Sequence, residues 1–360
     1  MKINYAIVGG GFSAFIAKTF LKKTSNIYFP ENHYFLKTRF FLKAPSYKVK
    51  KIFSTSLMPY VNLTPKLKFV SLHAHQLKGG NTNIWGGFIN IKKLPANFHR
   101  LLNNLNISAV KINQNSTGSS SNNPNIYQLQ MNSGHILNVS NYLISDKGLF
   151  LHSISIKNKI IKLFFLSPQN PNVKKIIFAK KVIIAVGVVD LIDLLFRSKM
   201  INDSCCIELS EYSYSRNLVL FKFPNSPFQN TKKLIIRFNI LRALCHMLGI
   251  QKTLPFNWLF NLLPFYVEQH FYGPKNKIQI NIKSGNLVDK ACIKSNKRKF
   301  IFGQSIHYCD LKINGKNINN FLKDIHPSLI GLGMAFVKQK EPGPISNDIT
   351  IDAIKKLKDF

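Results

Sequence analysis

The chain has 360 residues, with 50 Lys and Arg against 15 Asp and Glu, a formal net charge of +35 and 45% hydrophobic residues. This excludes an acidic disordered protein and a small disulfide-stapled domain, because a chain of this length buries a large core and five Cys are too few to staple it. The charge alone does not indicate nucleic acid or an anionic membrane as a partner, because only seven of the basic residues are Arg and Lys is spread along the whole chain.

The first elements in chain order are a strand, a glycine turn and a helix. The apolar run at residues 5–8 predicts a buried strand, and the three glycines at 9–11 predict a tight turn. Apolar residues at helical spacing up to residue 21 predict the helix. A second buried strand is expected at 27–29, where Pro30 ends it.

The turn matches the dinucleotide-binding fingerprint G-x-G-x-x-G/A. Gly9 permits the tight turn, Gly11 lets the backbone approach a pyrophosphate, and the small Ala14 lets the helix pack on the strand. Phe12 and Ser13 open the helix, whose N-terminal N–H groups and positive dipole suit phosphates. These five residues are therefore candidate cofactor ligands.

One carboxylate strengthens this interpretation. Glu31 is the only acidic residue among the first 145, and it follows Gly9 by 22 positions, at the end of the next predicted strand. A carboxylate there can accept both hydroxyls of an adenosine ribose, which favours FAD or NAD over NADP. The alternative is a glycine-rich turn of another α/β fold, with Glu31 in solvent.

Further along, the polar stretch 113–125 predicts a mobile loop, and the short alternating runs of 126–165 predict antiparallel strands. An apolar strand is predicted at 181–185 and a helix at 191–197, while 204–298 shows strands without a clear pattern.

The C-terminal 60 residues give three more expectations. They are a turn at Asn314-Gly315, a helix from Ser328 to Lys338, and a short terminal helix after Pro344.

Two further glycine-containing segments point to a flat ligand. The stretch 78–87 reads KGGNTNIWGG, and its Gly80, Asn81, Asn83 and Gly86 describe backbone laid closely against such a ligand. The second segment is the apolar strand at 181–185, which Gly187 interrupts and which is followed by Leu194-Leu195-Phe196-Arg197-Ser198.

With these segments in this order, the chain resembles the glucose-methanol-choline (GMC) family of FAD-dependent oxidoreductases. The resemblance implies an α/β fold with a Rossmann-like FAD-binding domain of the GR2 type (ββα) and a smaller antiparallel-sheet substrate domain. It also implies FAD as cofactor and oxidation of a CH–OH group of a sugar or small alcohol, with hydride transfer to flavin N5. The electron acceptor is left open.

The same resemblance extends loosely to the C-terminal part. It implies His307 as the catalytic base, His326 as its partner and Asp324 near the flavin ribityl chain. A neutral His suits proton removal because its pKa lies near working pH. Only 19 residues separate the two His, and the expected Gly after His307 is missing. A strand histidine satisfied by backbone is the alternative for His307. For the chain, the alternative is a flavin-binding protein without turnover, and a more distant one is a basic protein that binds nucleic acid or an anionic membrane.

These matches divide the chain into an FAD-binding domain (1–100, 140–200 and 300–345), a substrate or cap domain (101–139 and 201–299) and a C-terminal tail (346–360). The five Cys show no C-x-x-C spacing, so free thiols and no metal site are expected. No apolar run reaches the ~20 residues of a spanning helix. We therefore expect a cytoplasmic protein, with peripheral membrane contact left open. A specific nucleic-acid partner is not expected, because no Arg-rich segment is present.

Overall fold

The computed structural model describes most of the elements that surround the glycine turn. The described residues are 1–21, 25–29, 79–80, 87–111, 119–121, 125–144, 149–157, 160–166, 174–202, 205–219, 232–239, 265–283, 286–288, 309–339 and 345–360. Five predicted site residues lie outside them, namely Glu31, Asn81, Asn83, Gly86 and His307.

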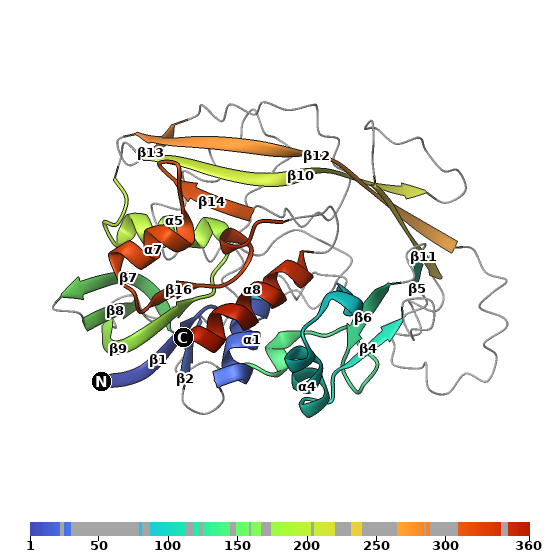
Figure 1. The fold of residues 1–360 in the computed structure, drawn as a ribbon, viewed down its shortest axis with the longest axis horizontal. Coiled ribbons are helices and arrows are strands. Elements are labelled where there is room, and N and C mark those ends of the chain that lie inside the picture. Colours follow the sequence, from blue (N-terminus) through green and yellow to red (C-terminus); the bar gives the residue numbers. More distant parts are fainter. Residues whose placement is uncertain are drawn as a thin grey trace.

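Four parallel strands form part of a six-stranded mixed sheet (Figure 1). Strand β1 (Lys2–Val8) lies between β2 (Ser25–Tyr28) and β9 (Lys174–Ile184), and β16 (Leu329–Gly331) pairs with the other edge of β9. All of these pairings are parallel, so the carboxyl ends of four strands from distant parts of the sequence meet at one edge.

Strand β9 also takes part in an antiparallel meander. Its first half, from Lys174 to Ala179, pairs with β8 (Ile160–Leu166), which in turn pairs with β7 (Phe150–Lys157). The predicted antiparallel strands of this region are confirmed.

Two hydrophobic cores lie on opposite faces of the parallel sheet. Ala6 and Val8 of β1 belong to the core that includes α5 (Val188–Arg197) and α7 (Ile318–Ile325). Ile7, between them, belongs to the core that includes α1 (Phe12–Leu21) and α8 (Ser346–Asp359). Successive side chains of a strand point to opposite faces, so this alternation gives a sheet with helices on both sides (Figure 1).

Two further antiparallel sheets complete the described part. The smaller has the order β3 (Phe88–Asn90), β6 (Ile126–Gln130), β4 (Ser108–Lys111), with α4 (Ala96–Asn104) beside it. The larger contains β5 (Ser119–Ser121), β10 (Cys206–Val219), β11 (Lys232–Asn239), β12 (Phe265–Lys283), β13 (Asn286–Val288), β14 (Cys309–Ile313) and β15 (Lys316–Asn317).

Most local predictions are confirmed, including the first strand, turn and helix, and the Asn314-Gly315 turn between β14 and β15. The α/β fold class is confirmed, with a Rossmann-like βαβ arrangement around the glycine turn. The predicted loop 113–125 contains strand β5, which pairs with β11. Within the predicted C-terminal tail, residues 346–359 form α8, which packs against α1.

The helix predicted at 328–338 is wrong. Strand β16 ends at Gly331, and a short 3-10 helix, η8, covers Met334–Phe336. Gly333 between them has φ +115° and ψ −170°, a backbone region open essentially to Gly alone and incompatible with a helix. Pairing of β16 with β9 decides this segment, and local spacing does not reveal such pairing.

In the described part of the chain, no helix combines the length and apolar character needed to cross a membrane.

Candidate functional site

The glycine turn lies at the edge where the carboxyl ends of the parallel strands meet. The backbone N–H of Gly9 donates a hydrogen bond to the carbonyl of Tyr28 (2.9 Å), and the N–H of Ala185 donates to the carbonyl of Val8 (2.7 Å). These bonds continue the sheet ladder one residue beyond the strands. Open α/β sheets bind ligands in the crevice outside this edge.

Gly9 is required by its geometry. It has φ +130°, and a Cβ added there would lie 2.3 Å from the carbonyl oxygen of Ala185. The contact is with backbone of the neighbouring strand end, so no side-chain movement relieves it. The tight turn predicted for the first fingerprint glycine is therefore present.

The second glycine segment lies against the first. A Cβ added to Gly11 would come within 3.9 Å of the Cα of Gly80, an ordinary van der Waals distance. Gly79 and Gly80 have φ values of +88° and +48°. The structure therefore brings two glycine turns, predicted separately from the sequence, to the same place.

Helix α1 presents a positive end at this edge. It begins at Phe12, directly after the turn, and its first turn contains no acidic side chain. The first-turn N–H groups of an α-helix have no acceptor within the helix, and the dipole adds partial positive charge. Helices α5 and α8 each carry an acid in the first turn, Asp190 and Asp348. Of these three, α1 is the helix start best suited to a phosphate group.

Some of the predicted cofactor-binding residues are buried in the core, and one is exposed. Ala14 is fully buried in the core shared with α8, which fits the helix-packing role of a small residue. Phe12 is buried as well, and its ring lies 6.2 Å from Phe15 and 6.3 Å from Phe98 between centroids. Gly187 is exposed just after β9 and caps the start of α5.

A third glycine segment, which sequence reasoning missed, closes on α1. Gly333 follows β16, and a Cβ added there would lie 3.0 Å from Oγ of Ser13. A Cβ on Gly331 would meet the ring of Phe336 at 1.8 Å. The signal was present in the sequence, because Gly-x-Gly after a short apolar run is the same pattern as the N-terminal turn.

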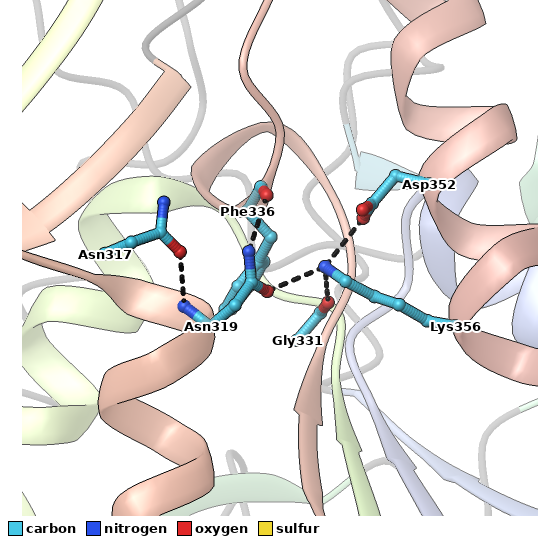
Figure 2. A network of polar contacts seen from close by, with 6 residues as sticks. All are labelled: Asn317, Asn319, Gly331, Phe336, Asp352 and Lys356. Carbon is cyan, nitrogen blue, oxygen red and sulfur yellow. Dashed lines mark hydrogen bonds and ion pairs between the residues drawn. The ribbon is translucent and has the colours of Figure 1, made fainter. Parts of the chain in front are cut away.

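A network of polar contacts fixes this segment at both ends (Figure 2). Nζ of Lys356, on α8, donates to the carbonyl of Gly331 (3.0 Å) and to Oδ1 of Asn319 (2.7 Å). It also forms an ion pair with Asp352 at 2.7 Å. Nδ2 of Asn319 donates to the carbonyl of Phe336 (2.9 Å). Two side chains thus hold the segment 331–336 where it meets Ser13.

Burial shapes the protonation of this network. It lowers the pKa of Lys356, and the neighbouring Asp352 opposes that shift. Burial likewise raises the pKa of Asp352, and Lys356 opposes it. Each charge therefore depends on the other, because a lone charge in this half-buried place lacks solvation.

The start of α8 is tied to the strand that follows the 78–87 segment. Oγ of Ser346 donates to the carbonyl of Phe88 (2.7 Å). The side-chain amide of Asn347 exchanges two hydrogen bonds with the backbone of Asn90, at 2.8 and 2.6 Å. Ser346 and Asn347 are buried, so these bonds hold α8 in register with β3.

Asp324 and His326 lie away from the glycine turns. Asp324 is exposed at the end of α7 and pairs with Lys316. His326 is buried, and its Nδ1 accepts the N–H of Ser328 (3.1 Å) in the turn that enters β16. This turn precedes the strand, whereas Gly331 ends it. The structure thus does not bring these two residues to the carboxyl edge, and their roles stay predictions.

The residues outside the described ranges keep their predicted roles as predictions. These are Glu31 for the ribose, Asn81, Asn83 and Gly86 for the flavin, and His307 as base. Within the described residues, no group of three or more His, Cys, Asp or Glu is placed to hold a metal ion.

No family model matches the chain, and no curated protein matches it. Solved structures resemble it only weakly. The substrate-free rebeccamycin biosynthetic enzyme REBC is 7% identical with a TM-score of 0.37, and OxyS anhydrotetracycline hydroxylase from Streptomyces rimosus is 9% identical with a TM-score of 0.32. Both alignments cover 98% of this chain and 61% of the other.

A flavoprotein/dehydrogenase from Cytophaga hutchinsonii is 10% identical with a TM-score of 0.28, over 76% of this chain and 56% of that one. The chain thus spans little more than half the length of these three structures. Likenesses this slight establish no family, so function has to be inferred from the chain's own residues.

Proposed function

We propose that the chain binds FAD at the carboxyl edge of the parallel sheet and acts as an FAD-dependent oxidoreductase. The observation that carries the proposal is Gly9, which has φ +130° and no room for a Cβ, since one added there would lie 2.3 Å from the carbonyl oxygen of Ala185. This turn lies directly before an acid-free helix start. That arrangement is the pyrophosphate site of dinucleotide-binding folds.

The residues present fit such a cofactor. Gly9, Gly11 and Gly80 put bare backbone on the approach to α1, and a dinucleotide needs that close approach. In this proposal the first turn of α1 binds the pyrophosphate, and Ser13 lies beside it. Glu31 would accept the ribose hydroxyls.

We prefer FAD over NAD because two further glycine segments lie at the start of α1, in addition to the fingerprint turn that either cofactor would need. From distant parts of the sequence, the turn at Gly80 reaches Gly11, directly before α1, and the segment at Gly333 reaches Ser13 in its first turn. The order of the glycine segments also resembles the GMC family. Bound FAD would supply two-electron oxidation chemistry.

The finer proposal is oxidation of a CH–OH group of a sugar or small alcohol. His307 would take the hydroxyl proton, a task suited to a neutral imidazole. The hydrogen bond that Nδ1 of His326 accepts from the N–H of Ser328 in a turn supports a positioning role for this residue. We therefore assign His326 to shaping the entry into β16, and leave His307 as the single candidate base.

The second candidate function is a flavin-binding protein without turnover. The short interval between His307 and His326 and the missing Gly favour it. Both candidates predict bound FAD, so they differ only in reduction of that flavin by substrate.

Anaerobic titration of FAD-loaded protein with a panel of sugars and alcohols separates the two candidates. An oxidoreductase of this kind loses its yellow absorbance with at least one compound, and His307→Ala slows that step by roughly 100-fold or more. His326→Ala serves as the matched control and leaves the pH profile of reduction unchanged. No bleaching by any compound, with intact FAD binding, favours the protein without turnover.

A further inference from the structure

The outer face of the meander combines exposed apolar side chains with lysines. In β8, Ile161, Leu163 and Phe165 are buried, and the alternate residues point the other way. In β9, Ile177 and Ala179 are buried and their alternate residues also face outward. We call this outward surface the outer face; its defining residues are Ile160, Lys162, Phe164, Lys174, Ile176 and Lys180.

Two apolar members of the outer face are cross-strand neighbours, and the third lies beside a lysine. Strand register places Phe164 opposite Ile176, and Ile160 lies two positions from Lys162 on the same strand. Ile160 and Ile176 are 48% and 40% exposed, among the most exposed large hydrophobic side chains described. Nζ of Lys162 lies 4.7 Å over the ring of Phe164, so cations and apolar groups interleave on this surface.

The charge of this region has one sign. Residues 147–189 contain eight Lys and no Asp or Glu. Lys174 and Lys180 are exposed at either side of Ile176. An ordinary solvated face mixes both signs of charge, whereas the defining residues of the outer face include three Lys and no acid, which favours an anionic partner.

We propose that the outer face docks on an anionic lipid surface. Ile160, Phe164 and Ile176 would enter the boundary between headgroups and acyl chains, while Lys174 and Lys180 would bind lipid phosphates. A lipid surface fits better than nucleic acid, because exposed isoleucines neither stack on bases nor bond to phosphates. The proposal is independent of the cofactor.

Sedimentation of the full chain with vesicles tests this directly. We expect binding to vesicles of equal parts phosphatidylglycerol and phosphatidylcholine, weakened as salt rises from about 0.1 to about 0.5 M, and far less binding to phosphatidylcholine alone. Changing both lysines, K174E with K180E, should weaken binding at least about tenfold. Changing Ile160→Ser with Ile176→Ser should weaken it as well, even at low salt.

Matched controls lie on α8, where Ile351 is also 40% exposed and Lys358 is exposed. Ile351→Ser and Lys358→Glu should leave vesicle binding unchanged. Equal binding to neutral vesicles, or equal losses from the α8 variants, would overturn the proposal. The proposal would also be overturned if the chain bound a single-stranded oligonucleotide more tightly than the anionic vesicles. In that case the lysine variants would abolish binding and the isoleucine variants would not, which indicates a nucleic-acid partner.

Discussion

Gly333 and Ser13, at opposite ends of the chain, meet so closely that a Cβ on Gly333 would lie 3.0 Å from Oγ of Ser13. The segment after β16 therefore closes on the first turn of α1, the helix start proposed to bind the pyrophosphate. Through this contact, the C-terminal part of the chain packs against the N-terminal fingerprint.

Gly333→Ala should destabilise the fold by about 1–3 kcal/mol, because φ +115° with ψ −170° is strained for any residue with a Cβ. Ser13→Ala in the same chain removes the close oxygen but not the backbone strain. The double variant should therefore recover less than half of the loss, as measured by chemical denaturation. Full recovery would show that the contact, and not the backbone, sets the cost.

Gly9→Ala should abolish FAD binding or prevent folding, because the new Cβ would lie 2.3 Å from a backbone oxygen. Gly315→Ala is the matched control, since Gly315 has φ +78° and no atom within 4 Å of an added Cβ. That variant should lose only about 1–2 kcal/mol of stability and bind FAD normally. Denaturation and FAD titration of both variants check this, and equal effects on FAD binding would refute the role of the turn.

Lys356→Met should lower stability by about 1–3 kcal/mol, because it leaves the carboxylate of Asp352 half-buried and frees the carbonyl of Gly331. FAD affinity should fall too, since the 331–336 segment loses one of its two anchors. Lys358→Met, an exposed change on the same helix, is the control and should alter neither quantity.

Adding Asp352→Asn to Lys356→Met should cost less than the sum of the single changes, because the pair is lost together. Additive losses would mean that the two charges do not depend on each other.

Cys205 should resist alkylation at neutral pH. Burial, with the neighbouring Cys206 second, raises the pKa of the Cys205 thiol to about 11 from an ordinary 9.0, so the reactive thiolate is scarce. A raised folded pKa adds stability that is full below about pH 9 and is lost as pH rises toward 11. Peptide-resolved iodoacetamide labelling across this pH range measures how fast the Cys205 thiol reacts. Labelling at about pH 8 as fast as that of a free thiol would contradict the burial.

The sequence was most informative where structure is set by neighbouring residues. The turn at 9–11 and helix α1 follow from three glycines and apolar spacing within 20 residues. The hairpin turn at Asn314-Gly315 is equally local, because both residues adopt positive φ there.

The features that could not be predicted from the sequence depend on contacts between residues far apart in the chain. Residues 328–338 have apolar spacing that resembles a helix, but β9 draws Leu329–Gly331 into the sheet. The pairing of Lys356 with Asp352 is local, at i,i+4 on one helix, but only folding places Lys356 against the carbonyl of Gly331. The contact of Gly80 with Gly11 is likewise long-range, although each glycine belongs to a turn that the sequence predicts.

Titration of the flavin-free full chain with FAD, followed by flavin absorbance and fluorescence, tests the central claim most directly. We predict saturable binding of one FAD per chain in the wild type and in Gly315→Ala, and none in folded Gly9→Ala. A wild-type chain that takes up no FAD, or a folded Gly9→Ala variant that binds it equally well, would contradict the proposed site.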